Sequence, residues 1–204
     1  MDRVFIAGAG YVGTVAARLL AQAGHAVDIG RRTPGDEPGT HAMDVLRPAT
    51  YPGALGEAGC IVYCVSADGF TEESYRDAYV TGLANVIAAA AKGRARRLVF
   101  VSSTGVFGQD DGSVVDESSP ALPKGFSGRT LLEGEALLAG APFEATAIRF
   151  SGIYGPGRDR LIRMVRSGSP VSAKSRAAIT NRIHRDDCAR AIVHLAGQPA
   201  VQPL

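Results

Sequence analysis

The chain has 204 residues, of which 46% are hydrophobic and 21% are charged, a composition that is ordinary for a soluble globular protein. Its formal net charge of +2 is too small to indicate nucleic acid or an acidic membrane surface as a partner. No apolar run approaches the roughly 20 residues of a membrane span. The first apolar strand begins at the third residue, which leaves no room for a signal peptide. We therefore expect a cytoplasmic protein with one domain, residues 1–204.

Cysteine and histidine do not indicate a disulfide framework or a metal site. The three cysteines are an odd number, and Cys60 and Cys64 fall on the same face of an apolar strand. We interpret them as small core residues. The four histidines are scattered without ligand spacing, so no metal is expected.

A glycine-rich turn follows the first apolar strand, residues 3–7, and precedes a helix-like run, residues 14–23. The order of strand, G-x-G-x-x-G and helix is typical of dinucleotide-binding sites. The first glycine would permit a tight turn, the second would admit a pyrophosphate, and the third would let the helix pack on the strand. Alanine at the first two glycines should therefore abolish nucleotide binding and leave the fold intact. A turn that serves helix packing, or another ligand, is the alternative. The cofactor-binding residues predicted in this turn are Gly8, Gly10, Tyr11, Val12 and Gly13.

The residues after the second strand, 26–29, indicate which dinucleotide binds. An NAD site usually carries an acid there for the ribose 2′-hydroxyl, whereas this chain has Gly30 followed by Arg31 and Arg32. Two guanidinium groups suit the 2′-phosphate of NADP, so we predict NADP(H) as the cofactor, with NAD as the alternative. Asp28 comes one residue too early and should point elsewhere, because strand side chains alternate. The other interpretation of the two arginines is that water simply solvates them.

Strands and helices alternate along the rest of the chain. This order predicts an α/β fold with a doubly wound parallel sheet, Rossmann-like. Ligands of such sheets bind beyond the carboxyl ends of the strands, which adds Asp44 and Ser66 to the predicted cofactor site. The remaining strands are predicted at 40–44, 60–65, 97–101 and 144–150, and the remaining helices at 48–57, 71–91, 127–138, 159–167 and 185–196.

Four segments resemble the extended short-chain dehydrogenase/reductase family, the NAD(P)-dependent epimerases and dehydratases, and more narrowly its atypical members. They are the glycine turn, L-V-F-V-S-S-T-G-V-F-G at 98–108, I-R-F-S-G-I-Y-G-P-G at 148–157 and N-R-I-H-R-D-D-C-A at 181–189. Extended members continue for several dozen residues beyond the last segment, so the resemblance implies a reduced C-terminal substrate lobe. An open pocket, closure by a partner chain such as a second copy in a homodimer, and a shortened chain are the alternatives.

The resemblance implies a catalytic hydroxyl, a tyrosine and, four residues later on the same helix face, a lysine. Thr104 stands at the hydroxyl position, with Ser103 beside it. The tyrosine and lysine positions of the aligned helix hold Ser127 and Leu131, and no Y-x-x-x-K occurs anywhere in the chain. The usual proton relay is therefore absent.

Two other tyrosines are candidates for the catalytic proton transfer. Tyr79 lies on the long helix and Tyr154 in the 148–157 segment, and their alternatives are packing and lining of the substrate pocket. We therefore expect an NADP(H)-binding oxidoreductase or epimerase that acts on a small hydroxyl- or carbonyl-bearing substrate, a sugar nucleotide among them. A non-catalytic NADP(H) sensor or scaffold is the alternative, favoured by the missing relay.

Four arginines follow the glycine-rich 155–157 turn and could meet an anionic substrate. Their spacing spreads them around a helix, so we favour a solvated face. They are Arg158, Arg160, Arg163 and Arg166.

Overall fold

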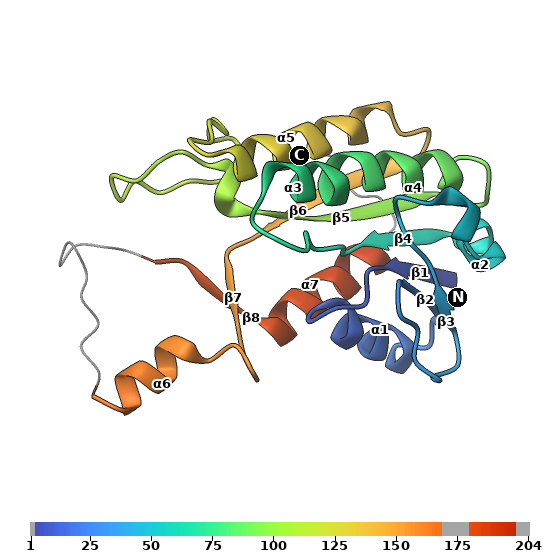
Figure 1. Cartoon of the computed structure of the whole chain (residues 1–204), viewed down its shortest axis with the longest axis horizontal. Helices are drawn as coiled ribbons and strands as arrows, with labels where there is room; N and C mark the ends of the chain where they lie inside the picture. Colours follow the sequence, from blue (N-terminus) through green and yellow to red (C-terminus); the bar gives the residue numbers. More distant parts are fainter. Residues whose placement is uncertain (1–2, 169–179, 199–204) are drawn as a thin grey trace.

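A computed structural model describes residues 3–168 and 180–198. Within them, six parallel strands form one sheet in the order β3-β2-β1-β4-β5-β6 (Figure 1). The chain winds outward from β1 in one direction and then, from β4, in the other, so the predicted doubly wound sheet is confirmed. The strands are β1 (Arg3–Ala7), β2 (Ala26–Arg31), β3 (Thr40–Ala42), β4 (Cys60–Tyr63), β5 (Arg97–Ser103) and β6 (Glu144–Phe150).

Helices cover both faces of the sheet. One layer contains α1 and α7, and the opposite layer contains α3, α4 and α5 (Figure 1). The predicted helix at 48–57 is instead a short 3₁₀ turn followed by α2, because Pro52 lies between them in an extended conformation. The helix bounds are α1 (Gly13–Gln22), α2 (Gly53–Glu57), α3 (Glu72–Arg76), α4 (Gly82–Ala90), α5 (Phe126–Leu137), α6 (Arg160–Arg166) and α7 (Arg185–Gly197).

Alternate side chains of the strands enter two separate hydrophobic cores. On β1, Val4 and Ile6 pack with α1 and α7, whereas Phe5 packs with the opposite layer. All three side chains are fully buried. Burial on both faces explains why the central strands are continuous apolar runs rather than alternating ones.

The long helix predicted at 71–91 is interrupted by a π-helical turn, Asp77–Thr81, between α3 and α4. A π-helical turn is wider than an α-helical turn and interrupts the regular hydrogen bonds between backbone carbonyl and amide groups. A buried side chain bonds to one of the carbonyl groups of this turn. The Tyr63 hydroxyl donates to the Ala78 carbonyl at 2.5 Å. Burial raises the pKa of Tyr63, so its phenol keeps the proton that it donates.

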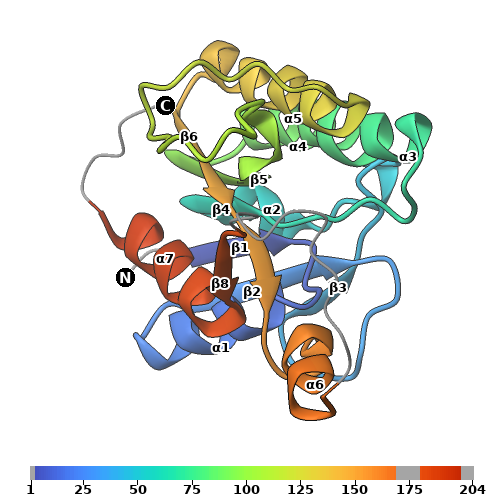
Figure 2. The same cartoon turned by 90° about the vertical axis from the view of Figure 1, so that its left-hand side faces the viewer.

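A second, two-stranded parallel sheet joins β7 (Gly152–Tyr154) to β8 (Arg182–His184). The sequence did not predict either strand, because each is three residues long and β7 directly precedes the glycine-rich 155–157 turn. The pair lies beside α7, and α6 stands apart from the two main layers (Figure 2). Of the chain's three lysines, Lys174 lies outside the described residues.

A buried ion pair ties α5 to β6. Arg149 donates to both carboxylate oxygens of Glu135, from Nε at 3.0 Å and from Nη2 at 2.6 Å, and the two side chains are only 14% and 10% exposed. Ser102, on β5, donates its hydroxyl to the same carboxylate at 2.6 Å. The bond to Glu135 raises the pKa of Arg149. Because both charges are paired, neither is an isolated ion in the interior.

Replacing Arg149 by methionine should lower the free energy of unfolding by about 3 kcal/mol, because Glu135 would remain buried without its cation. A chain that also carries Glu135→Leu should recover most of that loss. Urea unfolding of the two variants measures both quantities. If Arg149→Met unfolds at the wild-type urea concentration, the ion pair does not hold this layer together.

Candidate functional site

Two of the three glycines of the first turn are required by close backbone packing. Gly8 has a φ of +93°, and a Cβ added to it would lie 2.7 Å from the backbone of Cys64 and Val65. A Cβ on Gly13 would overlap the carbonyl oxygen of Gly8. The expectation that Gly8 and Gly10 could both become alanine without harm to the fold is therefore wrong for Gly8.

Gly10 differs from the other two, because a Cβ at this position would meet no atom within 4 Å. The turn around it is fixed by the Thr14 hydroxyl, which contacts the carbonyl oxygens of Ala9 at 3.0 Å and Gly10 at 2.9 Å. The space above Gly10 is thus open, as the approach of a ligand to the backbone requires.

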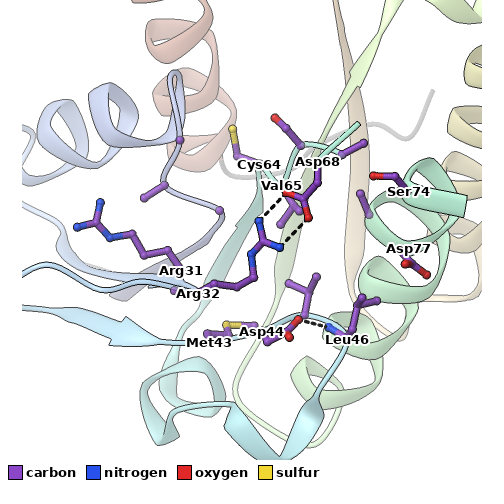
Figure 3. A pocket seen from close by; sticks show the side chains of 18 of the residues that line it. Arg31, Arg32, Met43, Asp44, Leu46, Cys64, Val65, Asp68, Ser74 and Asp77 are labelled. Atoms are coloured by element: carbon purple, nitrogen blue, oxygen red, sulfur yellow. Dashed lines mark hydrogen bonds and ion pairs between the residues drawn. The ribbon is translucent and has the colours of Figure 1, made fainter. Parts of the chain in front are cut away.

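This open space belongs to a cavity of about 730 Å³, the turn cavity (Figure 3). Its wall consists of residues 8–10, 30–33, 43–46 and 64–68, with further side chains from α3 and the π-helical turn. These segments follow the carboxyl ends of β1, β2, β3 and β4, the edge at which doubly wound sheets bind ligands. The predicted cofactor residues that line it are Gly8, Gly10, Arg31, Arg32, Asp44 and Ser66.

Asp28 lies away from this cavity, as its position in β2 predicted. The carboxylate is buried, accepts a hydrogen bond from Arg3 Nη1 at 2.9 Å and contacts His41 Nε2 at 2.8 Å. Asp44 does line the cavity, and its carboxylate accepts the backbone N–H of Leu46 at 3.0 Å.

The two predicted arginines diverge (Figure 3). Arg31 lies near Glu37, with Nη2 and Oε2 3.5 Å apart, and its buried Nε has no hydrogen-bond partner among the described residues. Arg32 extends toward the segment after β4, where Nη1 and Nη2 donate to the two carboxylate oxygens of Asp68 at 2.6 and 2.5 Å. Arg32 holds the pKa of Asp68 below its ordinary value, and Asp68 in turn raises the pKa of Arg32. Both groups are therefore charged at neutral pH.

Sequence reasoning missed Asp68, although a signal was present. Asp68 lies two residues beyond Ser66, at the end of a strand whose carboxyl edge was predicted to face the ligand. The acid of a dinucleotide site normally stands at the end of β2, so the residues after β4 were not predicted to supply one.

A second cavity of about 260 Å³ adjoins the first, and we call it the hydroxyl cavity. Cys64, Val65 and Ser66 line both, so the two spaces meet at the end of β4. Eight of the residues that line it are serines or tyrosines. They are Tyr11, Ser66, Tyr75, Tyr79, Ser102, Ser103, Ser127 and Ser151.

Ser127 and Leu131 line the hydroxyl cavity, one helical turn apart on α5. These are the positions at which the family resemblance implied a tyrosine and a lysine. Among the described residues, no lysine lines any of the three cavities at this edge of the sheet. The helix therefore presents a hydroxyl and an apolar side chain where a phenol and an ammonium were implied.

Tyr79, in the π-helical turn, lines the hydroxyl cavity, and Ala67 donates its backbone N–H to the phenol oxygen at 3.4 Å. Burial raises the pKa of Tyr79, so the phenol is protonated at neutral pH. Tyr75 lines the same cavity, with its ring centroid 5.2 Å from that of Tyr79. Sequence reasoning missed Tyr75, although its spacing of four residues from Tyr79 on a predicted helix places both on one face.

Of the four predicted catalytic residues, Thr104 and Tyr154 do not line the hydroxyl cavity. Thr104 lines a third cavity of about 520 Å³ beside Phe107 and Arg149, whereas its neighbour Ser103 lines the hydroxyl cavity. Ser103 also accepts the backbone N–H of Gly105 at 3.1 Å. Tyr154 lines none of these three cavities. Its catalytic role and that of Thr104 remain predictions.

Tyr11 connects the glycine turn to the β7–β8 side of the molecule. The Arg158 and Arg185 guanidinium groups lie 4.3 and 5.1 Å from the centre of its ring. Its hydroxyl is buried and, among the described residues, has no hydrogen-bond partner. Of the four arginines at 158–166, only Arg158 lines one of the three cavities. Arg163 pairs with Asp159 at 3.1 Å.

Cys64 borders both cavities but does not have the character of a nucleophile. Burial raises its pKa to about 12 and that of Cys188 to about 11. The thiolate is the reactive form, so both side chains are unreactive thiols at neutral pH.

Within residues 3–168 and 180–198, no helix has the length and apolar character needed to cross a membrane. In the same residues, no three side chains of the types that bind metals come together as a ligand set.

The glycine turn, the parallel sheet and the paired cavities at its carboxyl edge define a Rossmann-like protein of the short-chain dehydrogenase/reductase type. More particularly, the chain belongs to the family of the RmlD substrate binding domain, whose model matches residues 2–200. The resemblance to NAD(P)-dependent epimerases and dehydratases is thereby confirmed.

Solved structures share this fold. A Methylobacillus flagellatus protein assigned as an NAD-dependent epimerase/dehydratase is 41% identical over 97% of this chain and 70% of its own, with a TM-score of 0.80. MoeE5 in complex with UDP-glucuronic acid and NAD is 24% identical over 98% of this chain and 74% of its own, with a TM-score of 0.83. The UDP-N-acetylglucosamine 4-epimerase of Bacillus cereus is 16% identical over all of this chain and 74% of its own, also with a TM-score of 0.83.

Among curated proteins, YeeZ of Escherichia coli K12 is 37% identical over 81 residues. That match spans 39% of this chain and 29% of YeeZ.

Replacing Tyr11 by phenylalanine should leave the free energy of unfolding unchanged or raise it by up to about 1 kcal/mol, because the buried hydroxyl makes no bond. Tyr11→Leu should instead cost about 1–2 kcal/mol, since it removes the ring that faces two guanidinium groups. Chemical denaturation compares the two variants. A loss in Tyr11→Phe as large as that in Tyr11→Leu would mean that the hydroxyl is bonded.

Gly10→Ala should fold normally and bind a dinucleotide at least tenfold more weakly, because its methyl group would occupy the space that the phosphates need. Gly13→Ala should be unstable, since its Cβ overlaps a backbone oxygen. Thermal unfolding and calorimetric titration with NADPH measure the two effects. Gly53→Ala is the control, because its Cβ also meets no atom within 4 Å and lies outside the cavities. Wild-type affinity in Gly10→Ala would exclude the turn as the phosphate site.

Proposed function

We propose that this protein binds a nicotinamide dinucleotide, NADP(H) in preference to NAD(H), and acts as an oxidoreductase or epimerase on a sugar nucleotide. The observation that carries the proposal is the junction of the two cavities at Cys64, Val65 and Ser66. A ligand whose phosphates lie on the glycine turn can extend past this junction into a space lined by hydroxyl groups. We treat the chain as one domain, because both hydrophobic cores pack against the same sheet.

The chemistry of the turn cavity fits a dinucleotide. Gly10 leaves the backbone open, and the N-terminus of α1 favours the negative charge of a pyrophosphate. Arg31 is the last residue of β2 and Arg32 follows it, where the adenosine ribose of a dinucleotide lies in this fold. A guanidinium is the preferred partner of a 2′-phosphate. When bound, the nicotinamide ring would supply or accept a hydride.

Relatives support the choice of a sugar nucleotide as substrate. The protein at 41% identity is assigned as an NAD-dependent epimerase/dehydratase. MoeE5 and the Bacillus cereus protein share the fold. The structure of MoeE5 contains UDP-glucuronic acid, and the Bacillus cereus protein is a UDP-N-acetylglucosamine 4-epimerase. Arg158 in the hydroxyl cavity offers a cation to such an anionic substrate.

Tyr79 is the residue in the hydroxyl cavity best suited to proton transfer. It lines the cavity, and the raised pKa keeps its phenol protonated, so at neutral pH it can donate a proton to the oxygen of a carbonyl that is being reduced. Oxidation of an alcohol requires the phenolate instead. Its rate should therefore rise with pH toward the pKa of Tyr79. Ser103 and Ser127 can orient the reacting oxygen by hydrogen bonding.

A non-catalytic sensor or scaffold is the second candidate function. Ser127 and Leu131 favour it, because they occupy the positions of the missing relay within the cavity itself. The two candidates predict the same cofactor binding but different chemistry, so a single set of measurements separates them.

Calorimetric titration should show tighter binding of NADPH than of NADH, and Arg31→Ala with Arg32→Ala should weaken NADPH more than NADH. With oxidised cofactor and UDP-glucose or UDP-glucuronic acid, reduced nicotinamide should form at a rate that rises with pH. Tyr79→Phe should slow it on the order of a hundredfold or more, with unchanged cofactor affinity.

Three outcomes contradict the proposal in different ways. No binding of any nicotinamide dinucleotide would exclude the cofactor. Equal losses of NADPH and NADH affinity in the chain with both arginines replaced would mean that Arg31 and Arg32 do not bind the 2′-phosphate. Tight binding without hydride transfer from any sugar nucleotide to the oxidised cofactor would leave the sensor as the better description.

A further inference from the structure

The Arg32–Asp68 ion pair lies on the wall of the turn cavity and joins the segments that follow two different strands of the sheet (Figure 3). Arg32 directly follows β2, and Asp68 lies in the segment after β4. The contact is bidentate, with one guanidinium nitrogen on each carboxylate oxygen, and each side chain is 64% exposed. Both groups are therefore accessible to a ligand in the cavity and already paired with each other.

A bidentate pair uses the donors that a phosphate would need. The two N–H groups that Arg32 directs to Asp68 are one of the donor pairs with which a guanidinium can bind a 2′-phosphate. Phosphate binding must either displace the carboxylate or approach it closely, and like charges repel. Arg31 cannot replace Arg32 directly, because its side chain diverges toward Glu37.

The same carboxylate is an acceptor for a ribose hydroxyl. In an NAD site an acid at the end of β2 takes this role, but the acid of β2 in this chain, Asp28, is bonded to Arg3 and His41. Asp68 brings a carboxylate to the same cavity from the end of β4. Other acids on the wall, such as Asp77, have no ion pair with Arg32.

We propose that Asp68 is a specificity-determining residue: it holds Arg32 and thereby reduces the preference of the site for NADP(H) over NAD(H). This assignment depends on one part of the proposed function, the binding of a nicotinamide dinucleotide in the turn cavity. The chain should consequently discriminate less between the two cofactors than its two arginines alone would imply.

The test is the ratio of the dissociation constants for NADH and NADPH, measured by calorimetry on the full chain. Asp68→Asn should raise this ratio about fivefold, the upper range for an exposed ion pair, chiefly through tighter NADPH binding. Asp77→Asn is the matched control, because it removes the same charge from the same cavity wall and leaves the pair intact. It should change the ratio by less than twofold.

A double substitution separates the ion pair from a general effect of charge. In an Arg32→Ala chain, Asp68→Asn should raise the ratio by less than twofold, since Asp68 has no guanidinium to hold and only its repulsion of a phosphate remains. An unchanged ratio in Asp68→Asn, or an equal rise with and without Arg32, overturns the assignment of Asp68 and leaves cofactor binding established. A wild-type chain that binds neither nucleotide overturns the proposed function as well.

Discussion

The backbone of the glycine turn lies directly against the end of β4, with no side chain between them. Gly8 makes this possible, because its φ of +93° and its distance from Cys64 and Val65 both exclude a Cβ. The contact brings the segments after β1 and β4 together at the point where the strand order reverses. Both cavities open there, and they share the residues that the contact positions. The turn cavity and the hydroxyl cavity adjoin each other as a result of this one packing constraint.

Features that depend on local pattern were predictable from the sequence. The apolar runs, the spacing of glycines and the residues at strand ends led to the doubly wound parallel sheet and to the glycine turn at its carboxyl edge, because these signals are properties of consecutive residues. The position of Asp28 followed from the alternation of side chains in a strand. Even the loss of the usual relay residues could be read from α5, since Ser127 and Leu131 lie on one helical face.

Features that depend on distant residues could not be predicted in this way. The β7–β8 pair joins two three-residue segments that are far apart in the chain, and neither has a pattern of its own. The Arg32–Asp68 pair joins residues separated by 36 positions, and Ser103 and Thr104 diverge into different cavities although they are neighbours. In each case the three-dimensional packing decides which side chains meet, and no single segment contains that information.

The π-helical turn affects how this chain can be compared with its relatives. A π-helical turn holds about one residue more than an α-helical turn, and each residue of an α-helix turns the chain by about 100°. Asp77–Thr81 therefore rotates α3 relative to α4, compared with an uninterrupted helix of the same sequence. Residues counted backward from Gly82 along a regular helix would be assigned to the wrong face of α3. An alignment with a protein that lacks this turn needs a one-residue gap before it can equate any side chain with Tyr75.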